Sequence, residues 1–272
     1  MPESPTRVLS KARNVMDCFL PDNRPLTLTQ VATATGLPLS TARRLLQSLV
    51  AEEFLAQEDG AYRLGLGVIG WASAARRGLS VVDAARLPME SLRDLTGETV
   101  TLLVREGLQR VCVAAVPSTH VISQRSEPGE LAPLQAGSPS KVLLAWDPVT
   151  TQSVLDRGLR PLASGTVTDR EEFLQELATV RERGWAISFN ENAEGVASVS
   201  APIRDGSGAV VAALCLGGPT SRMSVEWLNR YAPELTGLAD RLSRALGAPV
   251  GVLASNRADG TMSVPVIEGE LV

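Results

Sequence analysis

Residues 26–64, LTLTQVATATGLPLSTARRLLQSLVAEEFLAQEDGAYRL, decide the fold of the N-terminal part of this chain. Thr27 followed by Gln30 fits a capping box at the start of a short helix, and Gly36 is a typical residue to end it. A longer helix is expected from about Leu39, because apolar residues recur on one of its sides at helical spacing. These residues are Ala42, Leu45, Leu46 and Leu49. The stretch therefore predicts two helices joined by a short turn.

The residues on either side of these two helices complete a recognisable motif. Two strand-like segments, 54–57 and 61–64, are joined through Asp59 and Gly60, a dipeptide that tolerates the positive φ of a tight hairpin. Apolar residues between Val8 and Phe19 fall at helical spacing and predict a first helix. Three helices followed by a hairpin predict a winged helix-turn-helix.

The polar side of the helix from Leu39 has the chemistry that DNA recognition needs. A helix-turn-helix reads base edges with the exposed N-terminal residues of its second helix, while other groups bind phosphate. Arginine can bridge guanine O6 and N7, and glutamine can pair with adenine. The predicted DNA contacts are Thr29, Ser40, Thr41, Arg43, Arg44, Gln47, Tyr62 and Arg63. An isolated amphipathic helix with two arginines is more often a solvated surface, but the order of elements favours DNA binding.

Composition and charge narrow the class of protein further. The chain has 272 residues, 44% hydrophobic and 21% charged, which is typical of a globular protein of about two domains. Its net charge is -4, but residues 1–79 hold nine Lys or Arg against seven Asp or Glu, which leaves -6 for the remainder. No run approaches the roughly 20 apolar residues of a membrane span. The N-terminus MPESPTRVLSKAR has no apolar core of a signal peptide, and the three cysteines are scattered. We therefore expect a cytoplasmic protein with no membrane partner.

The second part of the chain alternates between strand-like and helical runs. An α+β domain around a mainly antiparallel sheet is the expected result. The predicted strands are 99–104, 110–116, 196–203 and 209–216, and the predicted helices are 140–146, 170–183 and 225–246. The expected organisation is a winged helix-turn-helix at 5–75, a linker or dimerisation helix at 76–97, a ligand-binding domain at 98–247 and a tail of unassigned role at 248–272.

Several ordered segments together resemble one family. Residues 7–72 are similar to the N-terminal domain of IclR-family regulators, chiefly in the stretch at 26–55 and the hairpin GAYRLG at 60–65. The similarity continues through LRDLTGETV at 92–100. ELAPLQAGSPSKVLLAW at 130–146, VRERGWAISFNENAEGVASVSAPIRD at 180–205 and VVAALCLGGP at 210–219 resemble the effector domain of that family. Within the family, AGSPSKVLLAW and VCVAA look most like an actinobacterial subgroup tied to control of amino-acid biosynthesis.

The resemblance implies a DNA-binding transcriptional regulator, and we expect a repressor. We also expect a dimer or a dimer of dimers, because one helix-turn-helix neutralises few phosphates and gains affinity by pairing on a near-palindromic site. It also implies a GAF-like effector-binding domain whose pocket takes small organic ligands, often carboxylates. The pocket positions that carry over are Ala136, Gly137, Ser138, Pro139, Ser140, Ser188, Ser198, Cys215 and Gly217. Small residues at 136–140 would let N–H groups and hydroxyls approach an anion at a helix N-terminus. The sequence leaves open whether Cys215 contacts the ligand or packs in the core.

An enzyme is the main alternative class. Ser138 and Lys141 form an S-x-x-K tetrad of the kind used by penicillin-recognising serine hydrolases, but the S-D-N and K-T-G elements of those enzymes do not occur. His120 is the single histidine, so a His-rich metal site is excluded. The sequence also lacks a P-loop and a dinucleotide-binding glycine motif. We expect no catalytic residue, metal or cofactor. A pure interaction module is disfavoured because the helix face at Arg43 and Arg44 is cationic.

Overall fold

The computed structural model describes residues 6–20, 24–77 and 80–249, and the chain divides into two compact units, Met1–Leu79 and Ser80–Val272. The predicted fold class, a winged helix-turn-helix and an α+β domain, is confirmed. Most of the predicted tail, from residue 250 onward, lies outside the described residues.

The first unit has the helices and the hairpin that the sequence predicts. Its elements are α1 (Thr6–Asp17), β1 (Leu26–Thr27), α2 (Leu28–Thr35), α3 (Leu39–Ala51), β2 (Leu55–Glu58), β3 (Ala61–Leu64) and α4 (Gly67–Arg77). The three strands form an antiparallel sheet in the order β1-β3-β2. Both hydrogen bonds of the capping box at Thr27 and Gln30 are present. Asp59 and Gly60 have φ of 51° and 78°, as a tight hairpin turn requires.

A small apolar core fixes the orientation of α3 within this unit. Leu45, Leu46 and Leu49 of α3 pack with Val15 and Phe19, which lie on and after α1. Because these leucines point into the core, the polar residues between them are left on the outer side of the helix.

The second unit is built on one six-stranded sheet in the order β6-β5-β4-β9-β8-β7, and all neighbouring strands are antiparallel. The strands are β4 (Thr99–Glu106), β5 (Gln109–Val116), β6 (Leu131–Pro133), β7 (Ala186–Phe189), β8 (Val196–Arg204) and β9 (Val210–Pro219). The four predicted strands are all present, whereas β6 and β7 were not predicted. Both are short, at three and four residues, and so carry little periodicity.

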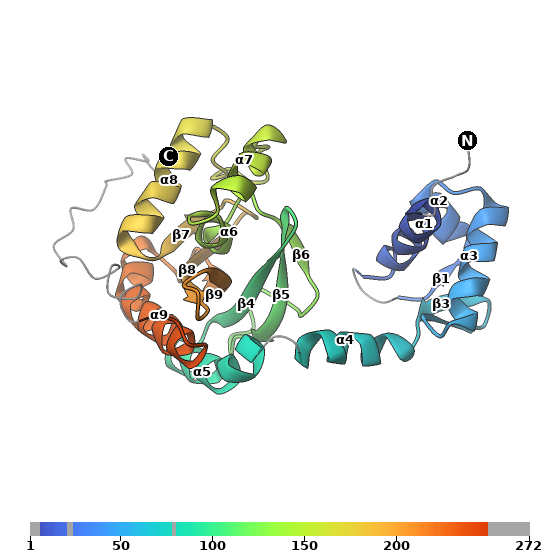
Figure 1. Ribbon diagram of the computed structural model, residues 1–272, viewed down its shortest axis with the longest axis horizontal. Helices are drawn as coiled ribbons and strands as arrows, with labels where there is room; N and C mark the ends of the chain where they lie inside the picture. Colours follow the sequence, from blue (N-terminus) through green and yellow to red (C-terminus); the bar gives the residue numbers. More distant parts are fainter. Residues whose placement is uncertain (1–5, 21–23, 78–79, 250–272) are drawn as a thin grey trace. The chain divides into compact units, whose positions relative to one another are not determined.

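Helices α5 to α9 cover the two faces of this sheet (Figure 1). They are α5 (Ser80–Thr96), α6 (Ser138–Leu144), α7 (Pro148–Asp156), α8 (Arg170–Arg183) and α9 (Val225–Ala245). In Figure 1, α5 and α9 lie on one side of the sheet, and α6, α7 and α8 lie on the other. α5 contacts β4 and α9, so it packs within the second unit. The sequence did not predict α7.

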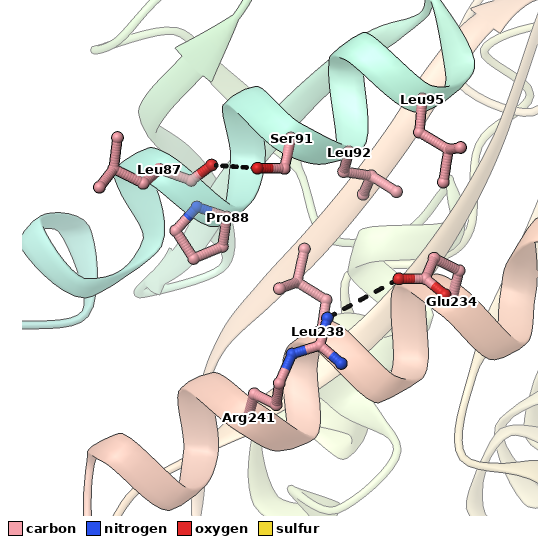
Figure 2. Close-up of a pocket in the computed structure, with 8 residues that line it drawn as sticks. All are labelled: Leu87, Pro88, Ser91, Leu92, Leu95, Glu234, Leu238 and Arg241. Carbon is pink, nitrogen blue, oxygen red and sulfur yellow. Dashed lines mark hydrogen bonds and ion pairs between the residues drawn. The ribbon is translucent and has the colours of Figure 1, made fainter.

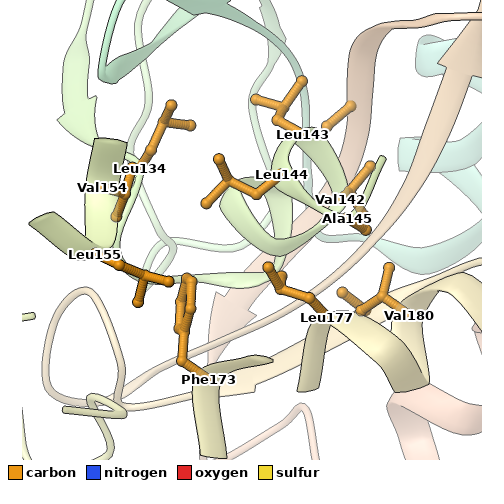
Figure 3. Close-up of a cluster of buried hydrophobic side chains, with 12 residues drawn as sticks. Leu134, Val142, Leu143, Leu144, Ala145, Val154, Leu155, Phe173, Leu177 and Val180 are labelled. Carbon is orange, nitrogen blue, oxygen red and sulfur yellow. The ribbon is translucent and has the colours of Figure 1, made fainter. Parts of the chain in front are cut away.

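A cluster of buried side chains holds α6 in place between the sheet and the outer helices (Figure 3). Val142, Leu143 and Leu144 of α6 pack with residues of α7 and α8, among them Phe173 and Leu177. These contacts hold the C-terminal half of α6 between the sheet and the outer helices.

Candidate DNA-binding surface and effector cavity

The outer face of α3 carries the predicted DNA contacts. Arg43, Arg44 and Gln47 are exposed, while Ala42 and Leu46, on the opposite side of the same helix, are fully buried. The three side chains therefore project from a helix whose position is fixed by its contacts with the core. Guanidinium and amide groups presented in this way can reach base edges and phosphates of a major groove.

The start of α3 also presents groups that can bind phosphate. Ser40 is exposed and Thr41 is half-buried, and Pro38 before them makes no side-chain cap hydrogen bond to the helix. The first N–H groups of a helix lack partners within the helix, and they favour anions. Thr29, in the first turn of α2, is exposed as well.

The hairpin confirms one predicted position as accessible and corrects the other. Arg63 is exposed and therefore accessible from solvent. Its Nη2 lies 3.1 Å from Oε2 of Glu58 across the hairpin. Tyr62 is only 6% exposed and belongs to the core with Leu26 and Leu55. The expectation that Tyr62 reaches DNA is therefore wrong. Alternation along β3 places it on the inner face of the three-stranded sheet.

A cavity of about 360 Å³ lies in the second unit, beside the start of α6. Its walls come from all six strands of the sheet, from the start of α6, from the loop that follows β5 and from the turn that follows β7. The lining residues are Thr101, Leu103, Arg110, Cys112, Ser123, Gln124, Arg125, Ser126, Glu130, Ala132, Gly137, Pro139, Ser188, Asn192, Ala193, Val196, Ser198 and Cys215. A site of this size with polar and apolar walls suits a small organic molecule.

The structure brings five of the nine predicted effector residues to this cavity. They are Gly137, Pro139, Ser188, Ser198 and Cys215. Ala136, Ser138 and Ser140 are buried beside it and do not line it. Gly217 lies against the loop after β5, where a Cβ would collide with Oε1 of Gln124. The absence of a side chain at Gly217 therefore makes room for the cavity wall.

A chain of serine hydroxyls runs from the cavity into the core. The Oγ of Ser198 lies 2.8 Å from that of Ser188 and 2.7 Å from that of Ser138, and Ser138 Oγ lies 2.8 Å from Ser200 Oγ. Ser188 and Ser198 line the cavity, whereas Ser138 and Ser200 are fully buried behind it. Ser138 thus supports the wall and does not face the cavity itself.

The loop before α6 was expected to offer N–H groups and hydroxyls to an anion, and the structure gives several of these groups partners within the protein. The N–H of Gly137 donates to Oε2 of Glu191 at 3.0 Å, and the N–H of Ser140 donates to the carbonyl of Gly137. The hydroxyl of Ser140 accepts a hydrogen bond from Arg110. The N–H groups of Gly137 and Ser140 and the hydroxyl of Ser140 therefore already have partners within the protein.

Lys141 is the cation of a charge cluster with two glutamates. Its Nζ lies 2.6 Å from Glu191 and 2.9 Å from Glu176, and it donates to the carbonyl of Ile187 at 3.1 Å. Burial raises the pKa of Glu191, and Lys141 counteracts that rise. Because the hydroxyl of Ser138 bonds to Ser198 and Ser200, both members of the S-x-x-K tetrad have structural contacts. This arrangement disfavours the hydrolase alternative.

Arg110 is a cavity residue that the sequence interpretation missed. It lies on β5 and is 6% exposed, and its Nη1 donates to the carbonyls of Pro133 at 2.9 Å and Ala136 at 2.6 Å. Burial lowers the pKa of its guanidinium to about 10, so the group stays protonated at neutral pH. The sequence does contain a signal for this residue, because Arg110 is the one charge in the apolar run RVCVAAV at 110–116. It lies two positions before Cys112, so both side chains are on the same face of the strand.

The two cysteines of the cavity are protonated thiols at neutral pH. Burial raises the pKa of Cys112 to about 12 and also raises that of Cys215. Neither has the lowered pKa of a nucleophilic thiolate. Their roles at the wall are those of small, weakly polar side chains.

The described residues contain neither a helix suited to a membrane nor a cluster of metal-binding side chains. No helix within the described ranges is long and apolar enough to cross a membrane. The part of the chain that the structure describes also has no group of three or more His, Cys, Asp or Glu side chains placed to hold a metal ion.

A winged helix-turn-helix and a separate α+β domain with a polar cavity define the class of two-domain transcriptional regulators. Family comparison agrees with this class. Residues 8–59 match the IclR helix-turn-helix domain, and residues 74–244 match the C-terminal domain of the bacterial transcriptional regulator IclR. The chain belongs to the IclR family.

Individual relatives span nearly the whole chain. It is 30% identical over 227 residues to the HTH-type transcriptional repressor AllR of Salmonella typhi, covering 81% of this chain and 83% of that protein. The solved IclR regulator of Alicyclobacillus acidocaldarius has 25% identity and a TM-score of 0.78, covering 89% of this chain and 99% of the other. An IclR homologue from Microbacterium hydrocarbonoxydans, solved in complex with 4-hydroxybenzoate, has 26% identity and a TM-score of 0.74, covering 88% and 99%.

Proposed function

We propose that this protein is a sequence-specific repressor whose affinity for operator DNA is set by a small organic acid bound in the cavity of the second unit. The observation that carries the proposal is the outer face of α3. Arg43, Arg44 and Gln47 are exposed there on a helix whose other side is fully packed. Thr29, Ser40, Thr41 and Arg63 add accessible groups that can hold phosphate.

The effector half of the proposal depends on the cavity. About 360 Å³ is room for roughly a dozen water molecules at about 30 Å³ each, so a small metabolite fits. The cavity combines the apolar Leu103 with the hydroxyls of Ser188 and Ser198, which suits a ligand with both apolar and polar parts. The homologue bound to 4-hydroxybenzoate supports a carboxylate-type ligand for this chain.

Self-association is part of the same proposal, because one helix-turn-helix neutralises few phosphates and gains affinity by pairing on a near-palindromic site. A groove between α5 and α9 offers a surface for it (Figure 2). Leu87 and Leu95 of α5 are 61% and 57% exposed at this groove, beside Leu238 of α9. Covering these side chains with a second copy would remove apolar surface from water.

We infer that regulation follows from the ligand favouring one arrangement of the paired DNA-binding units over another. A ligand shifts such an equilibrium only by its differential affinity for the two states. Effector binding and operator binding are then linked reciprocally.

Selection of genomic DNA fragments by the purified full-length protein tests the DNA-binding proposal. The selection is made at two salt concentrations, because phosphate contacts weaken steeply with salt and base contacts supply the specificity. We expect one discrete, near-palindromic site with half-sites about one helical turn, or a multiple of it, apart. Binding that ignores sequence and disappears at the higher salt, or no binding, would contradict the proposal.

A further inference from the structure

Arg110 is a buried cation for which the described residues supply no carboxylate partner at ion-pair distance. Its three hydrogen bonds leave from Nη1 and end on two carbonyls and the hydroxyl of Ser140, all of them neutral acceptors. None of the ion pairs between described residues includes Arg110. A guanidinium carries five N–H groups, two of them on Nη1. The other three, on Nη2 and Nε, are not used in these hydrogen bonds.

The charges around the cavity leave Arg110 with room for an anion. The charged lining residues are Arg110, Arg125 and Glu130, which sum to +1. Arg125 and Glu130 are exposed, so water screens their charges, and the Glu130 carboxylate accepts the N–H of Glu127 at 3.3 Å. Arg110 is the one charged lining residue that is buried. The acidic groups whose charges act on Arg110 are Glu130, which is exposed, and Glu191, which already pairs with Lys141 at 2.6 Å. Neither forms an ion pair with Arg110 among the described residues, so a bound anion would offset part of the cost of burying this charge.

The polar groups across the cavity suit the other end of such a ligand. Ser188 and Ser198, on neighbouring strands, present hydroxyls, and Asn192 adds an amide from the turn that follows β7. Hydroxyl and amide groups both donate and accept, so they fit hydroxyl or carbonyl groups of a ligand. None of the three carries a charge that would pair with a second carboxylate.

We propose that Arg110 is the residue that binds the effector's carboxylate and thereby selects monocarboxylates over neutral molecules of the same shape. This inference deepens the proposed function and rests on it for the identity of the site. Arg110 also ties the carboxylate to the loop before α6, because the same guanidinium holds the carbonyl of Ala136. Arg110 would therefore connect a bound ligand to the start of α6.

The test is a thermal-unfolding screen of the full-length protein without DNA. The probes are short-chain, 2-hydroxy and aromatic monocarboxylates, each beside its neutral amide, such as lactate with lactamide and benzoate with benzamide. We expect at least one acid to raise the melting temperature of the wild type by several degrees, because a ligand that binds only the folded state stabilises it. The matching amide is expected to have little effect.

Variants assign the selectivity to Arg110. In Arg110→Gln, the apparent affinity for that acid is expected to fall tenfold or more. Arg110→Lys keeps the charge, so it should still prefer the acid over the amide, with a smaller rise in melting temperature. If Arg110→Gln folds poorly, this variant tests whether the charge at position 110 sets the preference. Arg105→Gln is the matched control, because Arg105 is an arginine of the neighbouring strand β4 that pairs with Asp147 outside the cavity.

Three results would overturn the inference: an amide that stabilises as well as its acid, an unchanged acid response in Arg110→Gln, or no acid that stabilises the wild type. Operator binding plays no part in this screen. Acid selectivity in a protein that fails to select a DNA site would contradict the proposed function alone. Specific DNA binding without acid selectivity would contradict only the role of Arg110.

Discussion

Replacing both Arg43 and Arg44 by alanine is expected to weaken operator binding by about a thousandfold or more, because each arginine contact to DNA is worth about 1–3 kcal/mol and a dimer loses four of them. Both side chains are exposed on the outer face of α3 and have no role in the core. The melting temperature should therefore stay close to that of the wild type. Fluorescence anisotropy with the selected operator fragment measures the loss.

The matched control for this prediction removes the same charge from another part of the first unit. Lys11→Ala with Arg13→Ala changes two cations of α1, where Arg13 is exposed and lies 3.6 Å from Asp17. We expect only a small, salt-dependent loss from this control. Equal losses in the two double variants would show that net charge, and not the face of α3, determines the affinity.

Lys141→Met is expected to lower the free energy of unfolding of the second unit by about 3–5 kcal/mol, because removal of one partner leaves buried charge uncompensated. Lys141 Nζ is the cation between Glu191 and Glu176, and the side chain of Glu191 is only 7% exposed. The loss of Lys141 also removes the ion-pair partner of Glu191, whose carboxylate accepts the N–H of Gly137 in the loop before α6. Urea unfolding, followed by fluorescence, gives the difference.

The deficit of Lys141→Met should depend on pH in a defined direction. Burial already raises the pKa of Glu191, and removal of Lys141 raises it further. A carboxyl with a raised pKa in the folded state binds its proton more tightly there than in the unfolded chain. The variant therefore recovers stability as the pH falls toward the raised pKa and loses it as the pH rises.

Two further variants separate this effect from a simple loss of packing. Adding Glu191→Gln to Lys141→Met removes the most buried unpaired carboxylate, so it should restore part of the lost stability. Arg86→Met breaks an exposed pair with Glu90 at 3.5 Å and should change stability very little. A Lys141→Met variant as stable as the wild type would contradict the assignment of this cluster to the support of α6.

The sequence predicted well wherever the determining interactions are local. The capping box at Thr27, the turn at Asp59 and Gly60 and the apolar side of α3 each depend on residues within a few positions of one another. Such contacts leave a periodic or turn-specific pattern that can be read without the tertiary structure. The long strands β4, β5, β8 and β9 were predicted for the same reason.

The features that sequence reasoning missed depend on partners far along the chain. Gly137 bonds to Glu191, 54 positions away, and Arg110 reaches Ala136, 26 positions away. No local pattern shows that the loop's N–H is already occupied or that a cation lies across from it. Tyr62 was misassigned because a tyrosine in a hairpin suits either a DNA contact or a core position, and only the packing of β3 decides between them.

The most direct test of the whole account is the operator affinity of the wild type with and without a saturating concentration of the acid that stabilises it most. Linkage between the two sites predicts a change in Kd, typically about five- to 150-fold. For a repressor released by its ligand, the acid weakens binding. An operator affinity that stays the same across the full titration of the bound acid would contradict control of DNA binding by the cavity.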